Sequence, residues 1–198
     1  YRIPDFRLPK SILDKEIDRL HQLGIRLRSG VTFEEDPYAP PVLFSALTIR
    51  GGSAPYGGGI YSERGVTRMQ YTTMSDNIAS SSHPCSIAGG AAVFASESFI
   101  AENSIFTGNQ TPTTDVNDHI GVIATSNSET TSLDLAGTML VDNQSDWALV
   151  IADNSCTEAL GFGELREVAI ANNTGGGAYI SSSEITIQGS TISGNEVG

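Results

Sequence analysis

Residues 104–109 read Ser-Ile-Phe-Thr-Gly-Asn, residues 190–195 read Ser-Thr-Ile-Ser-Gly-Asn, and this repeated hexapeptide decides the fold. Three looser copies end at Asn77, Asn143 and Asn173. Each copy has an apolar residue three places before its Asn, which predicts a buried interior ladder of Met74, Phe106, Leu140, Ile170 and Ile192. The Asn residues suit corners with left-handed backbone angles and can bond to one another, which predicts a structural turn ladder of Asn77, Asn109, Asn143, Asn173 and Asn195.

Alternating apolar residues precede each hexapeptide and indicate a second strand with one buried face. Phe99 and Ala101 stand ten and eight places before Asn109, and equivalent residues precede the other copies. Gly-rich runs begin twenty places before three of the Asn residues, at residues 57, 89 and 175. The shortest interval between ladder Asn residues is 22 residues, and one such coil cannot bury its apolar face alone. Residues 42–198 are therefore predicted to be all-β, a parallel β-helix or solenoid of about five to six coils, incomplete at the C-terminus.

These repeats resemble those of right-handed parallel β-helix proteins. The pattern Gly-Gly-Gly-x-Tyr/Ile followed by Ser-Thr-Ile-Ser-Gly-Asn is similar to that of polymorphic outer-membrane proteins and autotransporter passenger domains, with pectate-lyase-like proteins further off. The resemblance covers roughly residues 42–198 and implies a right-handed coil in a secreted or cell-surface protein. Gly121 and Trp147 depart from it, because they stand where a Gly pair is expected.

The first part of the chain has a different character. Residues 1–31 carry seven Lys/Arg and four Asp/Glu, whereas residues 32–198 carry four Arg, no Lys and nineteen Asp/Glu. An apolar stripe of Leu13, Ile17 and Leu20 predicts a helix over 11–23, and a short strand follows it. Acidic residues and prolines make 32–41 a linker.

The stretch Ile-Pro-Asp-Phe-Arg-Leu-Pro-Lys at residues 3–10 resembles an internal segment of the glutamate synthase small subunit family. That resemblance covers about 30 residues and implies a flavin- and NADPH-dependent oxidoreductase of the cytoplasm. Its Gly-rich dinucleotide fingerprints are absent from the chain, so the activity does not carry over and no cofactor is predicted. We hypothesise that 1–31 is foreign to the repeats, a chimeric reading frame. The rival interpretation makes helix 11–23 a cap on the open end of the β-helix.

Composition excludes some classes of function. The net charge of −12 argues against nucleic acid as a partner. No apolar run approaches ~18 residues, so no membrane-spanning segment is predicted. The chain opens at Tyr1 rather than Met, which suggests a fragment, and neither full length, targeting signals nor oligomeric state can be read from it.

Two sets of residues are candidate sites. Stacking places Asp134 beside Glu164 on an outward strand face, with Arg166 next to them, and two carboxylates about 5 Å apart suit retaining glycoside hydrolysis. The structural interpretation is an ordinary charged strand face. An inserted loop holds oxygen-rich side chains that could take Ca²⁺, namely Asp115, Asn117 and Asp118 with His119, and here the alternative is a solvated polar loop. Trp147 is read as packing rather than sugar stacking.

The sequence therefore predicts an extracellular or outer-membrane repeat scaffold of the adhesin or passenger type, without catalysis of its own. A glycan or host-surface molecule is its expected partner, but the sequence does not identify the ligand. The alternatives are a carbohydrate-active enzyme on the same fold, either a polysaccharide lyase or a glycoside hydrolase, and a fragment of a flavin oxidoreductase.

Overall fold

The computed structural model describes residues 42–63, 65–80, 88–111, 119–127, 132–153, 161–181 and 183–196. The chain divides into two units, Tyr1–Asp36 and Pro37–Gly198, and all the described residues belong to the second. The predicted helix 11–23 and the predicted linker 32–41 lie outside the described residues.

Parallel strands make up three main sheets, and no helix occurs in the described ranges. Sheet A contains β1 (Val42–Ser45), β5 (Val66–Gln70), β9 (Ser98–Glu102), β12 (Ser132–Ala136), β15 (Gly161–Arg166) and β18 (Ser183–Gln188). Sheet B contains β2 (Thr48–Arg50), β6 (Thr73–Ser75), β10 (Ile105–Thr107), β13 (Met139–Val141), β16 (Ala169–Ala171) and β19 (Thr191–Ser193). Sheet C contains β4 (Ile60–Ser62), β8 (Ala88–Ala95), β11 (His119–Asn127), β14 (Gln144–Asp153) and β17 (Thr174–Ile180), and a small pair joins β3 (Ser53–Ala54) to β7 (Ile78–Ala79). The prediction of an all-β, parallel-stranded chain is confirmed for the described residues.

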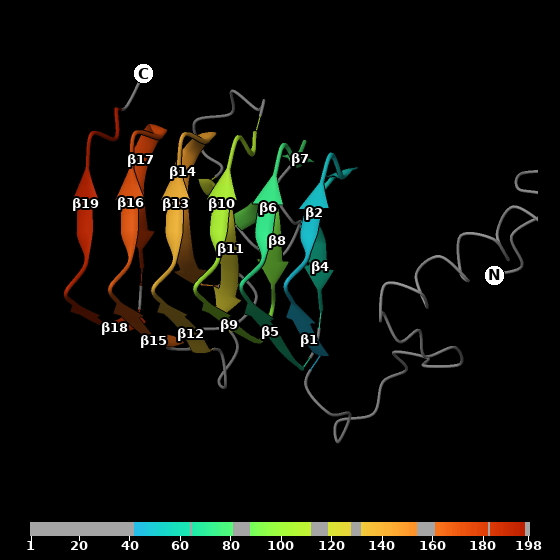
Figure 1. Ribbon diagram of the computed structural model, residues 1–198. Helices are drawn as coiled ribbons and strands as arrows, with labels where there is room; N and C mark the ends of the chain where they lie inside the picture. The colour runs from blue at the N-terminus through green and yellow to red at the C-terminus, as the bar shows by residue number, and fades with distance from the viewer. Residues whose placement is uncertain are drawn as a thin grey trace, which may run out of the picture. The chain divides into compact units, whose positions relative to one another are not determined.

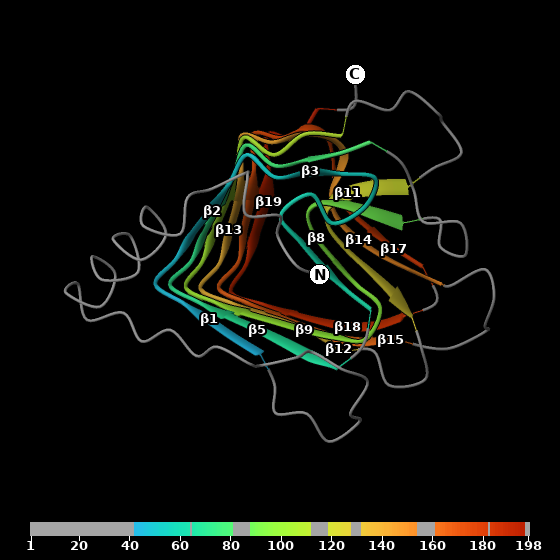
Figure 2. The same ribbon diagram turned by 90° about the vertical axis from the view of Figure 1, so that its right-hand side faces the viewer.

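The chain visits the sheets in a fixed order, and we call one passage through sheets A, B and C a circuit. Thus β9, β10 and β11 are followed by β12, β13 and β14, and each new strand pairs with its counterpart in the circuit before. Figure 1 shows the strands of sheet B side by side in this order, and Figure 2 shows the strands of each sheet lying over one another. Each circuit therefore pairs in space with the circuits that come directly before and after it in the sequence.

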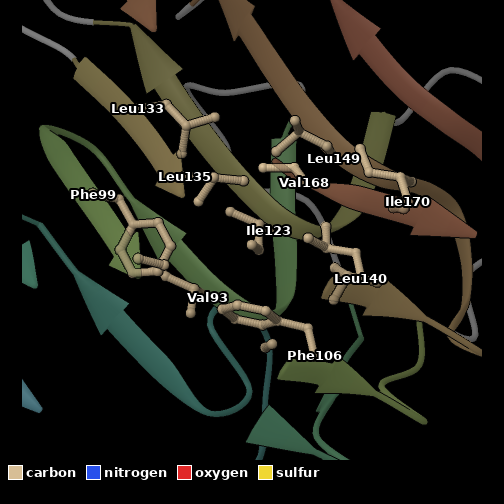
Figure 3. Close-up of a cluster of buried hydrophobic side chains, with 14 of the residues drawn as sticks. Val93, Phe99, Phe106, Ile123, Leu133, Leu135, Leu140, Leu149, Val168 and Ile170 are labelled. Atoms are coloured by element: carbon tan, nitrogen blue, oxygen red, sulfur yellow. The ribbon is translucent and has the colours of Figure 1, made fainter. Parts of the chain in front are cut away.

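The interior ladder follows the predicted register. Ile49, Met74, Phe106, Leu140, Ile170 and Ile192 are successive Cα partners across sheet B. Four of them, from Met74 to Ile170, are fully buried in one core with residues of sheets A and C, part of which Figure 3 shows. Ile192 differs from the prediction, because it is 47% exposed. The reason is its place on β19, the last strand of sheet B, which no described strand covers.

The Asn side chains line the corner between sheets B and C. In each step the Nδ2 of one Asn donates to the Oδ1 of the next, over 2.9 Å from Asn77 to Asn109 and 2.7 Å from Asn173 to Asn195. The same Oδ1 also accepts the backbone N–H of the preceding Asn; for example, Asn109 Oδ1 accepts the N–H of Asn77 at 3.1 Å. Every Nδ2 also donates to the carbonyl of an interior-ladder residue one circuit back, for example Asn143 to Phe106 at 3.0 Å. Each amide thus satisfies one backbone N–H and one backbone carbonyl of the preceding circuit.

The left-handed backbone at this corner belongs to a different residue from the one predicted. Positive φ occurs one place before each ladder Asn, at Asp76, Gly108, Asp142, Asn172 and Gly194. Asp, Asn and Gly are the residues that tolerate this conformation, so the turn is satisfied by the penultimate position of the hexapeptide. The final Asn is instead selected by its hydrogen bonds.

A second ladder, which the sequence analysis missed, lines the corner between sheets A and B. Ser104 Oγ accepts the N–H of Thr72 at 3.2 Å, and Ser190 Oγ accepts the N–H of Val168 at 3.0 Å. Thr138 Oγ1 also donates to the carbonyl of Ala101, one circuit earlier, at 3.2 Å. Val168 interrupts this column, because it occupies the equivalent place without a hydroxyl. We call it the hydroxyl ladder.

Candidate ligand-binding face

The outward face of sheet A gathers most of the polar chemistry of the described strands. Side chains alternate along each strand, so Leu133 and Leu135 of β12 enter the core while Ser132, Asp134 and Ala136 point outward. The same alternation on β15 buries Leu165 and leaves the outward set Phe162, Glu164 and Arg166. Because β12 and β15 pair in register, these outward residues form a grid.

The two predicted carboxylates are direct neighbours on this grid. Asp134 and Glu164 are Cα partners, and Arg166 contacts both of them. Its Nη2 lies 3.4 Å from Asp134 Oδ1, and its Nε lies 3.5 Å from Glu164 Oε2. The three side chains are 36%, 39% and 47% exposed, in the order Asp134, Glu164, Arg166. Exposed pairs of this kind contribute about 0–1 kcal/mol each to stability, so the cluster is a minor part of what holds the fold.

The position of Arg166 limits the chemistry that the carboxylates can perform. In retaining glycoside hydrolysis two carboxyl groups face one glycosidic bond, one as acid and the other as nucleophile. Here the Arg166 guanidinium lies within 3.5 Å of both carboxylates and is an ion-pair partner of each. The cluster forms a fork of donors and acceptors, which suits hydrogen bonding to a ligand.

Phe162 is a residue of this face that the sequence analysis did not single out. It is 52% exposed on β15, between Ser132 of β12 and Glu184 of β18. Its place two residues before Glu164 in an alternating strand was the signal that could have identified it as an outward aromatic ring. On the same grid, Ser132 Oγ donates to Ser98 Oγ at 3.0 Å and Gln70 Nε2 donates to Glu102 Oε2 at 3.1 Å.

Most of the predicted calcium ligands lie outside the described residues. Asp115, Asn117 and Asp118 lie outside the described residues, and His119 is the first residue of β11, where its Cα pairs with Ala88. Within the described ranges, no three His, Cys, Asp or Glu side chains form a group that could hold a metal ion. The calcium prediction stays untested.

Trp147 lies on sheet C, in a column where the other residues are glycine. Gly90, Gly121, Trp147 and Gly176 are successive Cα partners. A Cβ at Gly176 would overlap the Trp147 ring, so the ring lies against the backbone that this glycine leaves bare. The ring also packs near Tyr179, with centroids 5.5 Å apart, beside the buried Phe94, Ala124 and Val150. This placement is packing, as the sequence analysis favoured.

A second aromatic group lies at the first circuit of sheet C. The Tyr61 ring stacks on Phe94 with centroids 5.6 Å apart and planes 9° apart. Burial raises the pKa of the Tyr61 phenol, and the nearby Glu63 carboxylate and Tyr56 raise it further. Neither group on sheet C has the mixed carboxylate and guanidinium chemistry of sheet A.

The chain matches no protein-family model, and neither a curated protein nor a solved structure matches it. In the described parts of the chain no helix is long and apolar enough to cross a bilayer.

Proposed function

We propose that the described circuits form a right-handed parallel β-helix of the passenger type. The fixed visiting order of sheets A, B and C supports this proposal, as does the one-circuit spacing of every strand pair. The Asn ladder adds a repeated corner device, since each amide serves two circuits. The resemblance of the repeats to polymorphic outer-membrane and autotransporter passenger proteins supports an extracellular or cell-surface location.

We further propose that this β-helix is a binding scaffold without catalysis of its own. The observation that carries the proposal is the contact of Arg166 with both Asp134 and Glu164. An exposed fork of two acceptors and one donor can recognise hydroxyl-rich ligands, and both carboxylates that hydrolysis would need are already ion-paired with Arg166. The chain then acts by presenting flat strand faces to a glycan or another surface molecule.

A carbohydrate-active enzyme is the second candidate, and one observation favours it. Asp134 and Glu164 are paired Cα to Cα on an exposed face, where strands lie about 4.8 Å apart. If a ligand displaced Arg166, the two carboxylates would have the separation that a retaining hydrolase needs.

The test is incubation of the full chain with neutral and uronate polysaccharides, with and without calcium. New reducing ends and unsaturated products would be assayed, and binding would be measured on the same samples. The proposal expects binding without product. Product formation that Glu164→Gln abolishes would establish the enzyme, with Glu63→Gln, an exposed carboxylate outside sheet A, as the matched control.

A further inference from the structure

Phe162 is an aromatic ring placed among hydrogen-bonding side chains. The pairs of β15 with β12 and β18 put Ser132 on one side of it and Glu184 on the other, while Glu164 follows on the same strand. More than half of the residue is exposed. Sugar rings bind proteins through C–H groups laid on an aromatic face, with their hydroxyls held at the rim by carboxylates, hydroxyls and guanidinium groups. Phe162 therefore has a hydroxyl and two carboxylates at neighbouring positions of the grid, and the Arg166 guanidinium lies further along β15 beyond Glu164.

The grid also has the spacing of an extended glycan. Neighbouring strands of sheet A lie about 4.8 Å apart, close to the length of one pyranose ring, so a chain crossing the strands meets new side chains at every sugar. Starting from Phe162, such a chain passes the outward residues of β12 and then of β9, where Ser132 and Ser98 are joined by their hydroxyls. Further along the same strands the face offers more hydrogen-bond donors and acceptors, including Thr186 and Gln188 on β18, Glu102 on β9 and Gln70 on β5.

The charge of the face selects among glycans. Its described outward side chains include two cations and four anions, a net charge of −2: Arg68, Arg166, Glu102, Asp134, Glu164 and Glu184. Arg166 is already paired with two of the anions. A polyuronate would bring one more negative charge with every sugar and would meet repulsion, and the chain as a whole carries −12. A neutral glycan avoids this cost and still uses every hydroxyl-binding group.

We propose that the outward face of sheet A binds a neutral, extended glycan across its strands, with Phe162 as the stacking platform and the Asp134–Arg166–Glu164 fork as the hydroxyl clamp. The inference rests on the proposed scaffold function and gives that function a ligand class and a contact residue.

The test is affinity electrophoresis of the full chain in gels containing xyloglucan, galactomannan, mixed-linkage β-glucan or polygalacturonate. Retardation is expected in at least one neutral polysaccharide and not in polygalacturonate. Phe162→Ala should weaken binding about tenfold or more, as removal of a central aromatic contact does, while Phe162→Trp should keep it. Met139→Ala is the matched control, because Met139 is similarly exposed at 42% but lies on sheet B.

Three results would overturn the inference. They are equal or stronger retardation by polygalacturonate, no retardation by any of the three neutral polysaccharides, and unchanged binding in Phe162→Ala. Stronger retardation by polygalacturonate or unchanged binding in Phe162→Ala overturns only this inference, whereas the scaffold proposal fails if polysaccharide is cleaved or if neither neutral nor uronate polysaccharide is bound. The two proposals can therefore fail independently.

Discussion

At the scale of single residues, the side of the strand that a residue faces decides what its loss costs. Phe106 is fully buried and meets Phe99 edge to face with centroids 6.5 Å apart, whereas its neighbour Ile105 is 40% exposed. We expect Phe106→Ala to cost about 3–5 kcal/mol of unfolding free energy, because the cavity lies between stacked circuits. Ile105→Ala should cost less than about 1 kcal/mol. Urea unfolding of both variants checks this, and equal losses would mean that the inward register is wrong.

At Thr125 we predict that a substitution increases stability. Thr125 is fully buried, and its Oγ1 has no hydrogen-bond partner among the described residues. Thr125→Val keeps the shape and removes an unsatisfied hydroxyl, so it should raise the unfolding free energy by about 1 kcal/mol. Thr67 is the control, since its Oγ1 donates to Ser62 Oγ at 2.9 Å, and Thr67→Val should destabilise the protein. A loss of stability in Thr125→Val would show that the hydroxyl has a partner.

Residue-level prediction from the sequence succeeded where a repeat fixed the position. The offset from the terminal Asn identified Met74, Phe106, Leu140 and Ile170, which are all buried. The same offset failed for Ile192, because burial depends on a following strand and not on the residue itself. Phe162 was overlooked for a related reason: one outward aromatic residue has no repeat to identify it.

At the scale of elements, corners and strands differ in how well the sequence reveals them. The Asn corner was readable because its side chain is unusual in a strand and recurs at a fixed place. The corner between sheets A and B uses Thr72, Ser104, Thr138 and Ser190, whose hydroxyls are common everywhere in this chain. Its left-handed residues also vary in type, from Tyr71 to Gly137, so no composition signal marks the turn.

The gap in the hydroxyl ladder gives an element-scale prediction. Val168 is 2% exposed and occupies the place where the other circuits have Thr or Ser. In those circuits the hydroxyl accepts the N–H of the ladder residue one circuit earlier, and for Val168 that residue is Thr138. Val168→Thr keeps the shape and supplies the missing acceptor, so stability should stay level or rise by up to about 1 kcal/mol. Thr138→Val, which opens a new gap, should lower it. Thermal unfolding of both variants measures the effect. A clearly lower Tm for Val168→Thr would contradict the idea that the ladder can be extended.

At the scale of the whole molecule, the question is whether residues 1–36 contribute to the stability of the circuits. The hypothesis of a foreign segment rests on the reversal of charge near residue 31 and on the two unlike resemblances. It predicts that deletion of 1–36 leaves the Tm of the remaining chain unchanged. A cap would instead cover an open sheet end, and its loss would lower the Tm by several degrees or cause aggregation.

A substitution in the full chain gives an independent control for the deletion. Replacement of Ile17 by Lys puts a charge on the apolar stripe without shortening the chain. The foreign-segment hypothesis expects no change in Tm, and a fall in both variants would favour the cap.

The stacking of successive circuits is the central claim, and disulfide trapping tests it most directly. In a chain with Cys85 and Cys156 changed to Ser, we would oxidise Ser75→Cys with Thr107→Cys, which are Cα partners on sheet B. One strand spacing, about 4.8 Å, is within the reach of a disulfide, whereas the two spacings from Ser75 to Val141 are not. The account predicts rapid cross-linking of the first pair and none of Ser75→Cys with Val141→Cys. Failure of the first pair to cross-link, or equal cross-linking of both, would contradict it.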